Sequence, residues 1–442
     1  MKKAIVFIGF LAAVILLMAY GVAQAQGPTY VGSDKCALCH GAKYELYQQT
    51  WHARMLRPAS EETVVGDFAS TDPDLTFTLD QVAYVVGGQF SQRYLTEMEG
   101  ELYVLPAQWN VTPGEWVPYH PDDWQDRPYA RYCAGCHTSG FDAETETWSE
   151  AGVQCEACHG PGSEHVALTG ERTAIVNPAL SDFQAQTEIC GQCHSRGTDP
   201  TGVYEFPVGF QPGGPLKLDD AFIAATDDEH FWPDGSSKAH HQEYLDWQKS
   251  PHAAGVSCVF CHVSHSHGET AHQTRWVGNH RCLICHEEKK DLQAHIPYME
   301  PQSAFCTDCH MPTLAKAATA EYNFDIHSHT FWPPDPAATI RYGGQEAMPN
   351  ACNLCHTDKT PQWAAQVLGM EVTAITPVPT PTPMPPPTPV PTAVSAIPTV
   401  APAPPSGLAG IPWAWLGGAV VAIVAVMAVI VIQGSRHQEV ES

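Results

Sequence analysis

Basic residues are scarce in this chain of 442 residues. Lysine and arginine together number 22, against 48 aspartates and glutamates, and the formal net charge is -26 at pH 7. Such an acidic surface repels phosphate backbones and anionic lipid headgroups. The composition therefore excludes nucleic acid as a partner and disfavours adsorption to an anionic membrane surface. The same charge favours basic or cationic partners.

The chain also has no cysteine outside a Cys-x-x-Cys motif. All 16 cysteines fall into eight Cys-x-x-Cys pairs, and a histidine follows every pair. A disulfide framework would not need these histidines, and a structural zinc site would combine two pairs or place its histidines at other spacings. The pattern is instead the attachment signature of c-type haem. Two such thiols bond to the vinyl groups of one porphyrin, and the next histidine reaches the iron as its proximal ligand.

The motifs therefore predict eight haem c groups. The predicted thioether cysteines are Cys36, Cys39, Cys133, Cys136, Cys155, Cys158, Cys190, Cys193, Cys258, Cys261, Cys282, Cys285, Cys306, Cys309, Cys352 and Cys355. The predicted proximal iron ligands are His40, His137, His159, His194, His262, His286, His310 and His356. Because porphyrins supply much of the apolar core, we expect the chain without haem to be largely unfolded.

Long apolar runs occur at the two ends of the chain. Residues 1–25 combine two lysines, an apolar run and the sequence Ala23-Gln24-Ala25, which predicts a secretory signal peptide, with an uncleaved anchor as the alternative. Residues 411–432 carry no charge and are long enough to cross a hydrocarbon core of about 30 Å. They predict one C-terminal transmembrane helix, with a buried helix of a soluble domain as the alternative, followed by a cytoplasmic tail at 433–442.

Residues 371–410 separate the last motif from the predicted membrane helix and are rich in proline and threonine. Proline fixes φ and removes a backbone donor, so this linker is predicted to be an extended polyproline II stalk. A spacer with no length requirement is the alternative. The order of segments predicts a single-pass protein of the cell membrane. Its haem region, 26–370, lies on the extracytoplasmic side, in the periplasm or at the cell surface.

The spacing of the motifs predicts the fold class. Most gaps between neighbouring motifs leave room for little more than a short helix, so we expect a mainly α chain with extensive irregular loops and with haems as its core. The long first gap differs, because residues 92–95 and 102–105 flank Glu99-Gly100 and predict a β-hairpin. Residues 26–130 are expected to hold the first haem and a small β-containing subdomain, and residues 131–370 to form a haem-dense region.

Distal ligands for the irons are available in surplus. The chain has 23 histidines, far more than the eight in the motifs. Bis-histidine ligation favours a low potential, because methionine is the ligand that raises it. The candidate distal ligands are His52, His165, His252, His329, His272, His280, His295 and His120.

Several motifs resemble a known superfamily. They are Ser250-Pro251-His252-Ala253, Cys155-x2-Cys158-His159-Gly160-Pro161-Gly162, Cys306-x2-Cys309-His310-Met311-Pro312 and His327-x-His329-Thr330-Phe331. This multihaem cytochrome superfamily includes the tetrahaem cytochromes of nitrifying bacteria, pentahaem nitrite reductase and octahaem hydroxylamine oxidoreductase. The resemblance covers about residues 34–357. It implies alternating stacked and perpendicular haem pairs, with His52, His165, His252 and His329 as distal ligands.

The chain departs from the enzymes of that superfamily in two ways. Some of them replace the final histidine of one motif with lysine, whereas here all eight motifs end in histidine. Those enzymes also carry long helices after the last motif, whereas here the proline-rich linker follows it closely. Both departures favour an electron carrier over an enzyme.

We therefore expect a membrane-anchored octahaem cytochrome that transfers electrons between the membrane respiratory chain and an extracytoplasmic partner protein or terminal acceptor. No residue is assigned a catalytic role. The alternative is a multihaem oxidoreductase that acts on a small nitrogen or sulfur compound at one haem with an open distal site. In that case the remaining histidines, especially His265, His267, His240 and His241, are candidates to line the pocket. The oligomeric state is left open.

Overall fold

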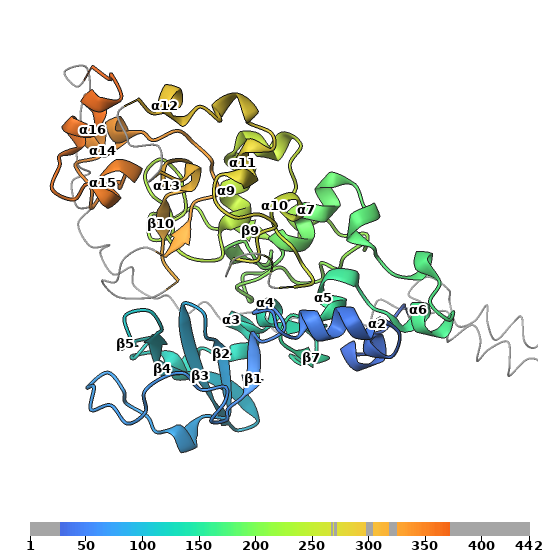
Figure 1. Ribbon diagram of the computed structural model, residues 1–442. Coiled ribbons are helices and arrows are strands. Elements are labelled where there is room, and N and C mark those ends of the chain that lie inside the picture. Colours follow the sequence, from blue (N-terminus) through green and yellow to red (C-terminus); the bar gives the residue numbers. More distant parts are fainter. Residues whose placement is uncertain (1–26, 267, 269–271, 298–303, 318–324, 372–442) are drawn as a thin grey trace, which may run out of the picture. The chain divides into compact units, whose positions relative to one another are not determined.

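The computed structural model describes residues 27–371, apart from 267, 269–271, 298–303 and 318–324 (Figure 1). The predicted signal peptide, almost all of the proline-rich linker, the predicted membrane helix at 411–432 and the tail lie outside the described residues. Within the described part of the chain, no helix is both long enough and apolar enough to cross a membrane.

The largest regular element is a five-stranded antiparallel sheet with the strand order β1-β2-β3-β4-β5. The turn between β3 and β4 consists of Glu99 and Gly100, both with positive φ (54° and 88°). Two residues of positive φ match the right-handed twist of a tight hairpin, so the predicted hairpin is confirmed. The strands are β1 (Leu56–Pro58), β2 (Tyr84–Gly87), β3 (Ser91–Met98), β4 (Glu101–Asn110) and β5 (Glu115–Pro118).

Both faces of this sheet are packed, because neighbouring residues of a strand point to opposite faces. One face packs an aromatic cluster that contains Phe77, Tyr94 and Trp116. The other face, which includes Leu95 and Val104, packs against Tyr129 and Ala134. Tyr129 begins α3 (Tyr129–Tyr132) and Ala134 begins α4 (Ala134–His137), the helix of the second motif, and both lie beside the sheet in Figure 1. The sheet is therefore the platform on which the second motif is built.

The other motifs lie on short helices joined by irregular loops. Their helices are α2 (Ser33–Tyr47), α5 (Cys155–His159), α7 (Phe183–Gly191), α10 (Cys258–Cys261), α11 (His280–Leu283), α13 (Cys306–His310) and α15 (Ala351–Cys355). The remaining helices are α6 (Ser163–Ala167), α8 (Leu218–Ala221), α9 (Glu243–Lys249), α12 (Leu292–His295), α14 (Pro336–Arg341) and α16 (Pro361–Val367). Three small sheets pair β6 (Thr138–Ser139) with β7 (Glu150–Ala151), β8 (Gly197–Thr198) with β9 (Ile223–Ala224), and β10 (Thr313–Ala315) with β11 (Ile326–His327).

Side-chain caps begin several of these helices. Asp182 accepts a hydrogen bond from the backbone N–H of Ala185 at the start of α7 (2.9 Å), and Thr360 accepts one from Trp363 at the start of α16 (3.2 Å). Such a cap stabilises a short helix by about 1 kcal/mol. The described residues therefore form a mixture of short helices and small sheets. The short helices, the loops and the N-terminal β-containing part agree with the prediction, but a sheet and not a helix is the largest element.

Candidate haem centres

One large cavity runs through the described residues. Its volume is ≈ 1780 Å³, which exceeds the roughly 300–1,000 Å³ of an ordinary small-molecule site. Six of the eight motifs contribute to its wall, namely those that begin at Cys133, Cys155, Cys190, Cys258, Cys282 and Cys306. The size and the lining fit several porphyrins and not a single ligand.

The cysteines fit the same cofactor. All sixteen lie in the described part of the chain, and none of them forms a disulfide. Every pair therefore keeps two thiols available for thioether bonds. A protein stapled by disulfides would have shown the opposite.

Six motif histidines face a second histidine. An iron held by two imidazoles at bonds of about 2 Å places the ring centroids roughly 6 Å apart. The facing pairs and their centroid distances are His40–His165 (6.4 Å), His194–His52 (6.1 Å), His159–His265 (6.0 Å), His286–His252 (6.1 Å), His262–His329 (6.3 Å) and His310–His295 (6.2 Å). Each pair leaves room for an iron between its rings.

The Nδ1 atoms of several of these rings are already engaged. His159 and His165 place Nδ1 against the carbonyl oxygens of Val176 and Glu171, both at 2.8 Å. His329 does the same with the carbonyl of His327 at 2.9 Å. An acceptor at Nδ1 fixes the proton there and leaves the Nε2 lone pair free for a metal, which is the usual outer contact of a metal-binding histidine. The donor set therefore fits haem iron.

The eight candidate distal ligands fall into two groups, according to whether they lie opposite a motif histidine. Five of them lie opposite a motif histidine, namely His52, His165, His252, His295 and His329. The other three lie elsewhere. His120 packs on Tyr119 at 4.6 Å, His272 lies against Phe90 and His327 at 5.9 and 5.8 Å, and His280 is exposed at the start of α11.

His265 takes a place that the sequence did not reveal. Under the alternative enzyme hypothesis it is a candidate to line a catalytic pocket, but its ring lies opposite His159. The two residues are far apart in the sequence, and no local motif around His265 points to such a partner. His267 lies outside the described residues.

Two motif histidines have a different environment. The ring of His137 lies 6.3 Å from Tyr129, and the ring of His356 lies 5.0 Å from Trp363. Among the described residues, no second histidine faces either ring at the spacing of the six pairs. The surplus of histidines in the sequence therefore does not supply a facing imidazole to every motif in this part of the chain.

The surroundings of His137 are polar and cationic. Its Nδ1 atom is buried and has no hydrogen-bond partner in the described segments. The cavity wall on this side includes Arg93, Arg196, His240 and His241. Burial, followed by the charge of Arg93, lowers the pKa of His137 to about 4. Burial and the charge of Arg196 hold the pKa values of His240 and His241 well below the usual range, so both imidazoles are neutral near pH 7.

Positive charge in this region comes from arginine. Arg93 donates from Nε to Oε1 of Gln108 (3.0 Å) and lies over the ring of Tyr119, with 4.1 Å from Cζ to the ring centroid. Arg196 donates from Nη2 to the carbonyl of His240 (3.3 Å), and its buried Nε has no partner in the described residues. No described carboxylate lies within 4.0 Å of either guanidinium, unlike those of Arg127 and Arg131. This part of the cavity is therefore suited to a small anion.

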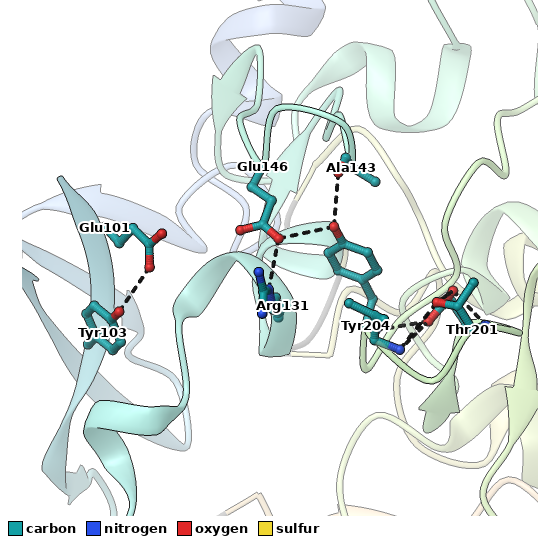
Figure 2. Close-up of polar contacts among 9 residues, drawn as sticks. Glu101, Tyr103, Arg131, Ala143, Glu146, Thr201 and Tyr204 are labelled. Carbon is teal, nitrogen blue, oxygen red and sulfur yellow. Dashed lines mark hydrogen bonds and ion pairs between the residues drawn. The ribbon is translucent and has the colours of Figure 1, made fainter. Parts of the chain in front are cut away.

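A polar network outside the cavity braces the second motif (Figure 2). Arg131 of α3 donates from Nε to Oε1 of Glu146 at 2.8 Å. The hydroxyl of Tyr204 donates to the carbonyl of Ala143 at 3.0 Å and lies 3.3 Å from Oε1 of Glu146. These contacts tie α3 to two loops and hold the backbone that leads into α4. Unlike Arg196, Arg131 is thus paired and does not line the cavity.

One motif histidine is held by a carboxylate. Nδ1 of His194 lies 2.9 Å from Oε2 of Glu243 at the start of α9. Burial alone would raise the pKa of Glu243, but the charge and hydrogen bond of His194 lower it to about 2. That lowering depends on a positive charge on His194; when the imidazole is neutral, as in an iron ligand, the hydrogen bond from Nδ1 is what still favours the ionised carboxylate.

Interactions between cysteines of different motifs show which motifs are neighbours. The thiols of Cys36 and Cys155, Cys136 and Cys193, Cys190 and Cys258, and Cys282 and Cys306 are close enough to influence each other's pKa strongly. Longer-range electrostatic interactions link Cys158 with Cys193, Cys261 with Cys285, and Cys309 with Cys352. The motifs thus form one series in the order first, third, fourth, fifth, sixth, seventh and eighth. The second motif joins this series at the fourth.

Free thiols in attachment motifs, facing imidazoles and a cavity shared by several motifs define a protein that holds c-type haems. Comparisons with known proteins agree. Residues 120–160, which contain the second motif, match the family model described as cytochrome c554 and c-prime. The fold is similar to that of the outer cell wall cytochrome OcwA, with a TM-score of 0.62 and 22% identity, over 77% of this chain and 86% of that chain.

Two curated relatives match by sequence. The dissimilatory sulfite reductase MccA of Wolinella succinogenes is 20% identical over 382 residues, which cover 64% of this chain and 51% of that protein. The cytochrome c nitrite reductase subunit NrfA of Nitratidesulfovibrio vulgaris is 24% identical over 190 residues, which cover 36% of this chain and 32% of that subunit. The chain thus spans about half of the first relative and a third of the second. With the motifs, these similarities identify the chain as a member of the multihaem cytochrome c superfamily.

Proposed function

We propose that this chain is an octahaem c-type cytochrome that transfers electrons between the membrane respiratory chain and an extracytoplasmic partner or terminal acceptor. The observation that carries the proposal is the continuous series of motifs from the first to the eighth. When bound, the haems supply the redox step. The chain supplies the sixteen thioether cysteines, the eight proximal histidines and the close spacing of the motifs.

We propose distal ligation by the six histidines that face a motif histidine, which are His52, His165, His252, His265, His295 and His329. Bis-histidine centres of this kind have low potentials and bind no substrate, which suits a carrier of electrons. Most of these ligand pairs join distant parts of the chain, His295 and His310 being the nearest in sequence, so haem attachment would also hold the loops in place.

We propose that the haem region is exported and tethered. Residues 1–25 serve as the signal peptide, residues 371–410 as the stalk and residues 411–432 as the membrane helix. The similar fold of a cytochrome named for the outer cell wall supports a position outside the membrane. An acidic surface favours a basic redox partner or a cationic or mineral acceptor.

The haem count and the transfer of electrons test this proposal together. Mass spectrometry of the purified full-length protein is expected to show eight covalent haems. The dithionite-reduced protein is expected to deliver one electron per haem to a soluble ferric chelate. A mature protein with fewer than eight haems, or reduced haems that ferric iron does not reoxidise, would contradict it.

Replacing His329 with glycine tests the ligand pairs. The variant is expected to lose the imidazole opposite His262 and to gain one high-spin ferric haem, because glycine offers no donor atom. Electron paramagnetic resonance of the oxidised protein measures the change. The matched control is His280→Gly, which removes an exposed candidate and should leave the spectrum unchanged. Equal spectra for the two variants would rule out the proposed assignment.

A second function is favoured by the site around His137. It lacks a facing histidine among the described residues, and it has two arginines with no described carboxylate within 4.0 Å and two neutral histidines, although Glu205 and Asp227 also line the cavity. We propose, as this second candidate, the reduction of a small nitrogen or sulfur oxyanion. When bound there, haem supplies a reducible iron. Arg93 and Arg196 would bind the anion, and the neutral imidazoles of His240 and His241 would donate hydrogen bonds to it. The names of the two curated relatives, a sulfite reductase and a nitrite reductase, agree with this chemistry.

A further inference from the structure

The fourth motif occupies the junction of the haem series. The thiol of Cys190 interacts with that of Cys258 in the fifth motif, and the thiol of Cys193 interacts with that of Cys136 in the second. Cys158 of the third motif interacts electrostatically with both Cys190 and Cys193. In the series that these interactions define, the fourth motif is the neighbour through which the second motif joins the others. The potential of a haem at this position decides how readily electrons enter the branch.

The proximal histidine of this motif also has an unusual partner. His159 and His262 place Nδ1 against neutral backbone carbonyls, at 2.8 and 2.9 Å. His194 instead meets the carboxylate of Glu243 at 2.9 Å. The nearest analogue is Glu288 beside His286, where the atoms are 3.8 Å apart and both side chains are more than half exposed. Among the described residues, Glu243 is the one carboxylate within hydrogen-bond distance of a motif histidine.

A carboxylate changes what the histidine does to an iron. Its full negative charge draws the Nδ1 proton toward itself and makes the imidazole a stronger donor at Nε2. The Glu243 side chain lines the cavity and is only 21% exposed, so its charge is less screened than a charge at the surface. Both effects stabilise the ferric form over the ferrous form. A neutral carbonyl, as at His159 and His262, has a much weaker influence.

We propose that Glu243 is the residue that tunes the junction. It acts through His194 and holds the fourth haem at a lower potential than a carbonyl partner would. The lower potential makes electron transfer from the fourth haem to its neighbours, including the haem of the second motif, more favourable. Glu243 is thus a positioning residue for electron distribution and not a catalytic residue. The inference rests on the proposed function, because it assumes haem at all eight motifs.

The test is a redox titration of the full-length holoprotein that carries Glu243→Gln. Glutamine keeps the size and an oxygen acceptor but removes the charge. One midpoint potential is expected to move upward, while the haem count and the number of low-spin haems stay unchanged. Glu243→Asp, which retains the charge, should shift that potential less than the glutamine variant does. The matched control is Glu288→Gln, which removes the same charge beside His286 without a hydrogen bond and should leave all potentials in place.

The possible outcomes distinguish a failure of this inference from a failure of the proposed electron-transfer function. Unchanged potentials in Glu243→Gln, or equal shifts in Glu243→Gln and Glu288→Gln, would overturn the role of Glu243 and leave the electron-transfer proposal intact. A wild-type protein without haem at the fourth motif, shown by peptide mass mapping of Cys190 and Cys193, would overturn both. If the glutamine variant loses haem, the redox titration is carried out on the aspartate variant instead. Its midpoint potentials are then expected to equal those of the wild type or to lie slightly above them.

Discussion

Replacing Arg196 with glutamine is expected to weaken the binding of nitrite or sulfite to the oxidised holoprotein by roughly 10- to 100-fold. A hydrogen bond to a charged group contributes about 1.5–3 kcal/mol, and each 1.4 kcal/mol is about a factor of ten in affinity. The guanidinium is suited to this role because its Nε is buried without a partner in the described residues and no described carboxylate lies within 4.0 Å. Titration of each anion, followed by the absorbance of high-spin haem, measures the affinity.

The control for this experiment is Arg131→Gln. Arg131 carries the same charge and lies close in sequence to the second motif, but it is paired with Glu146 and lies outside the cavity (Figure 2). Its replacement should leave anion affinity within about twofold of the wild type, because Arg131 does not line the cavity and cannot touch the anion. Loss of its surface ion pair should cost at most about 1 kcal/mol of stability. If both variants bind equally well, or if the wild type binds neither anion, the second candidate function fails and electron transfer alone remains.

The cofactor was predictable because its signal is local. Two thiols and a histidine within five residues define a c-type haem site, so the cysteines and the proximal histidines follow from the sequence alone. The hairpin at Glu99-Gly100 was predictable for the same reason, since two turn residues fix it. The outer strands β1 and β5 are only three and four residues long, and β1 ends at Pro58 but pairs with β2, which begins at Tyr84. No local sequence pattern predicts strands of that length.

Distal ligands were harder because they depend on long-range contacts. His52 and His194 lie in different parts of the chain, as do His159 and His265, and only the folded structure brings each pair together. The open environment of His137 was hidden for a related reason. All eight motifs end in histidine, so the sequence does not distinguish the second from the others. The second motif differs because no histidine faces it among the described residues. Arg93 on β3 and Arg196 in the loop after α7 also lie in the cavity wall near it.

The sheet explains why a cavity of this kind can exist at the second motif. Near the other motifs the haems, when bound, would supply much of the apolar core, but α3 and α4 rest on a conventional packed core in which Leu95 is fully buried against Tyr129 and Ala134. Replacing Leu95 with alanine is expected to lower the free energy of unfolding by about 2–5 kcal/mol, because it removes buried methyl groups and leaves a cavity. Denaturant unfolding followed by the fluorescence of the sheet tryptophans measures this loss.

The same strand provides the control, since Glu97 is exposed and Glu97→Ala should change the free energy of unfolding by no more than about 0.5 kcal/mol. The location of the loss is as informative as its size. If the sheet is the platform of the second motif, the Leu95→Ala variant should lose anion binding at His137 at a lower denaturant concentration than it loses the low-spin haem signals of the other motifs. Simultaneous loss of both signals would mean that haem attachment, and not the sheet, holds α3 and α4 in place.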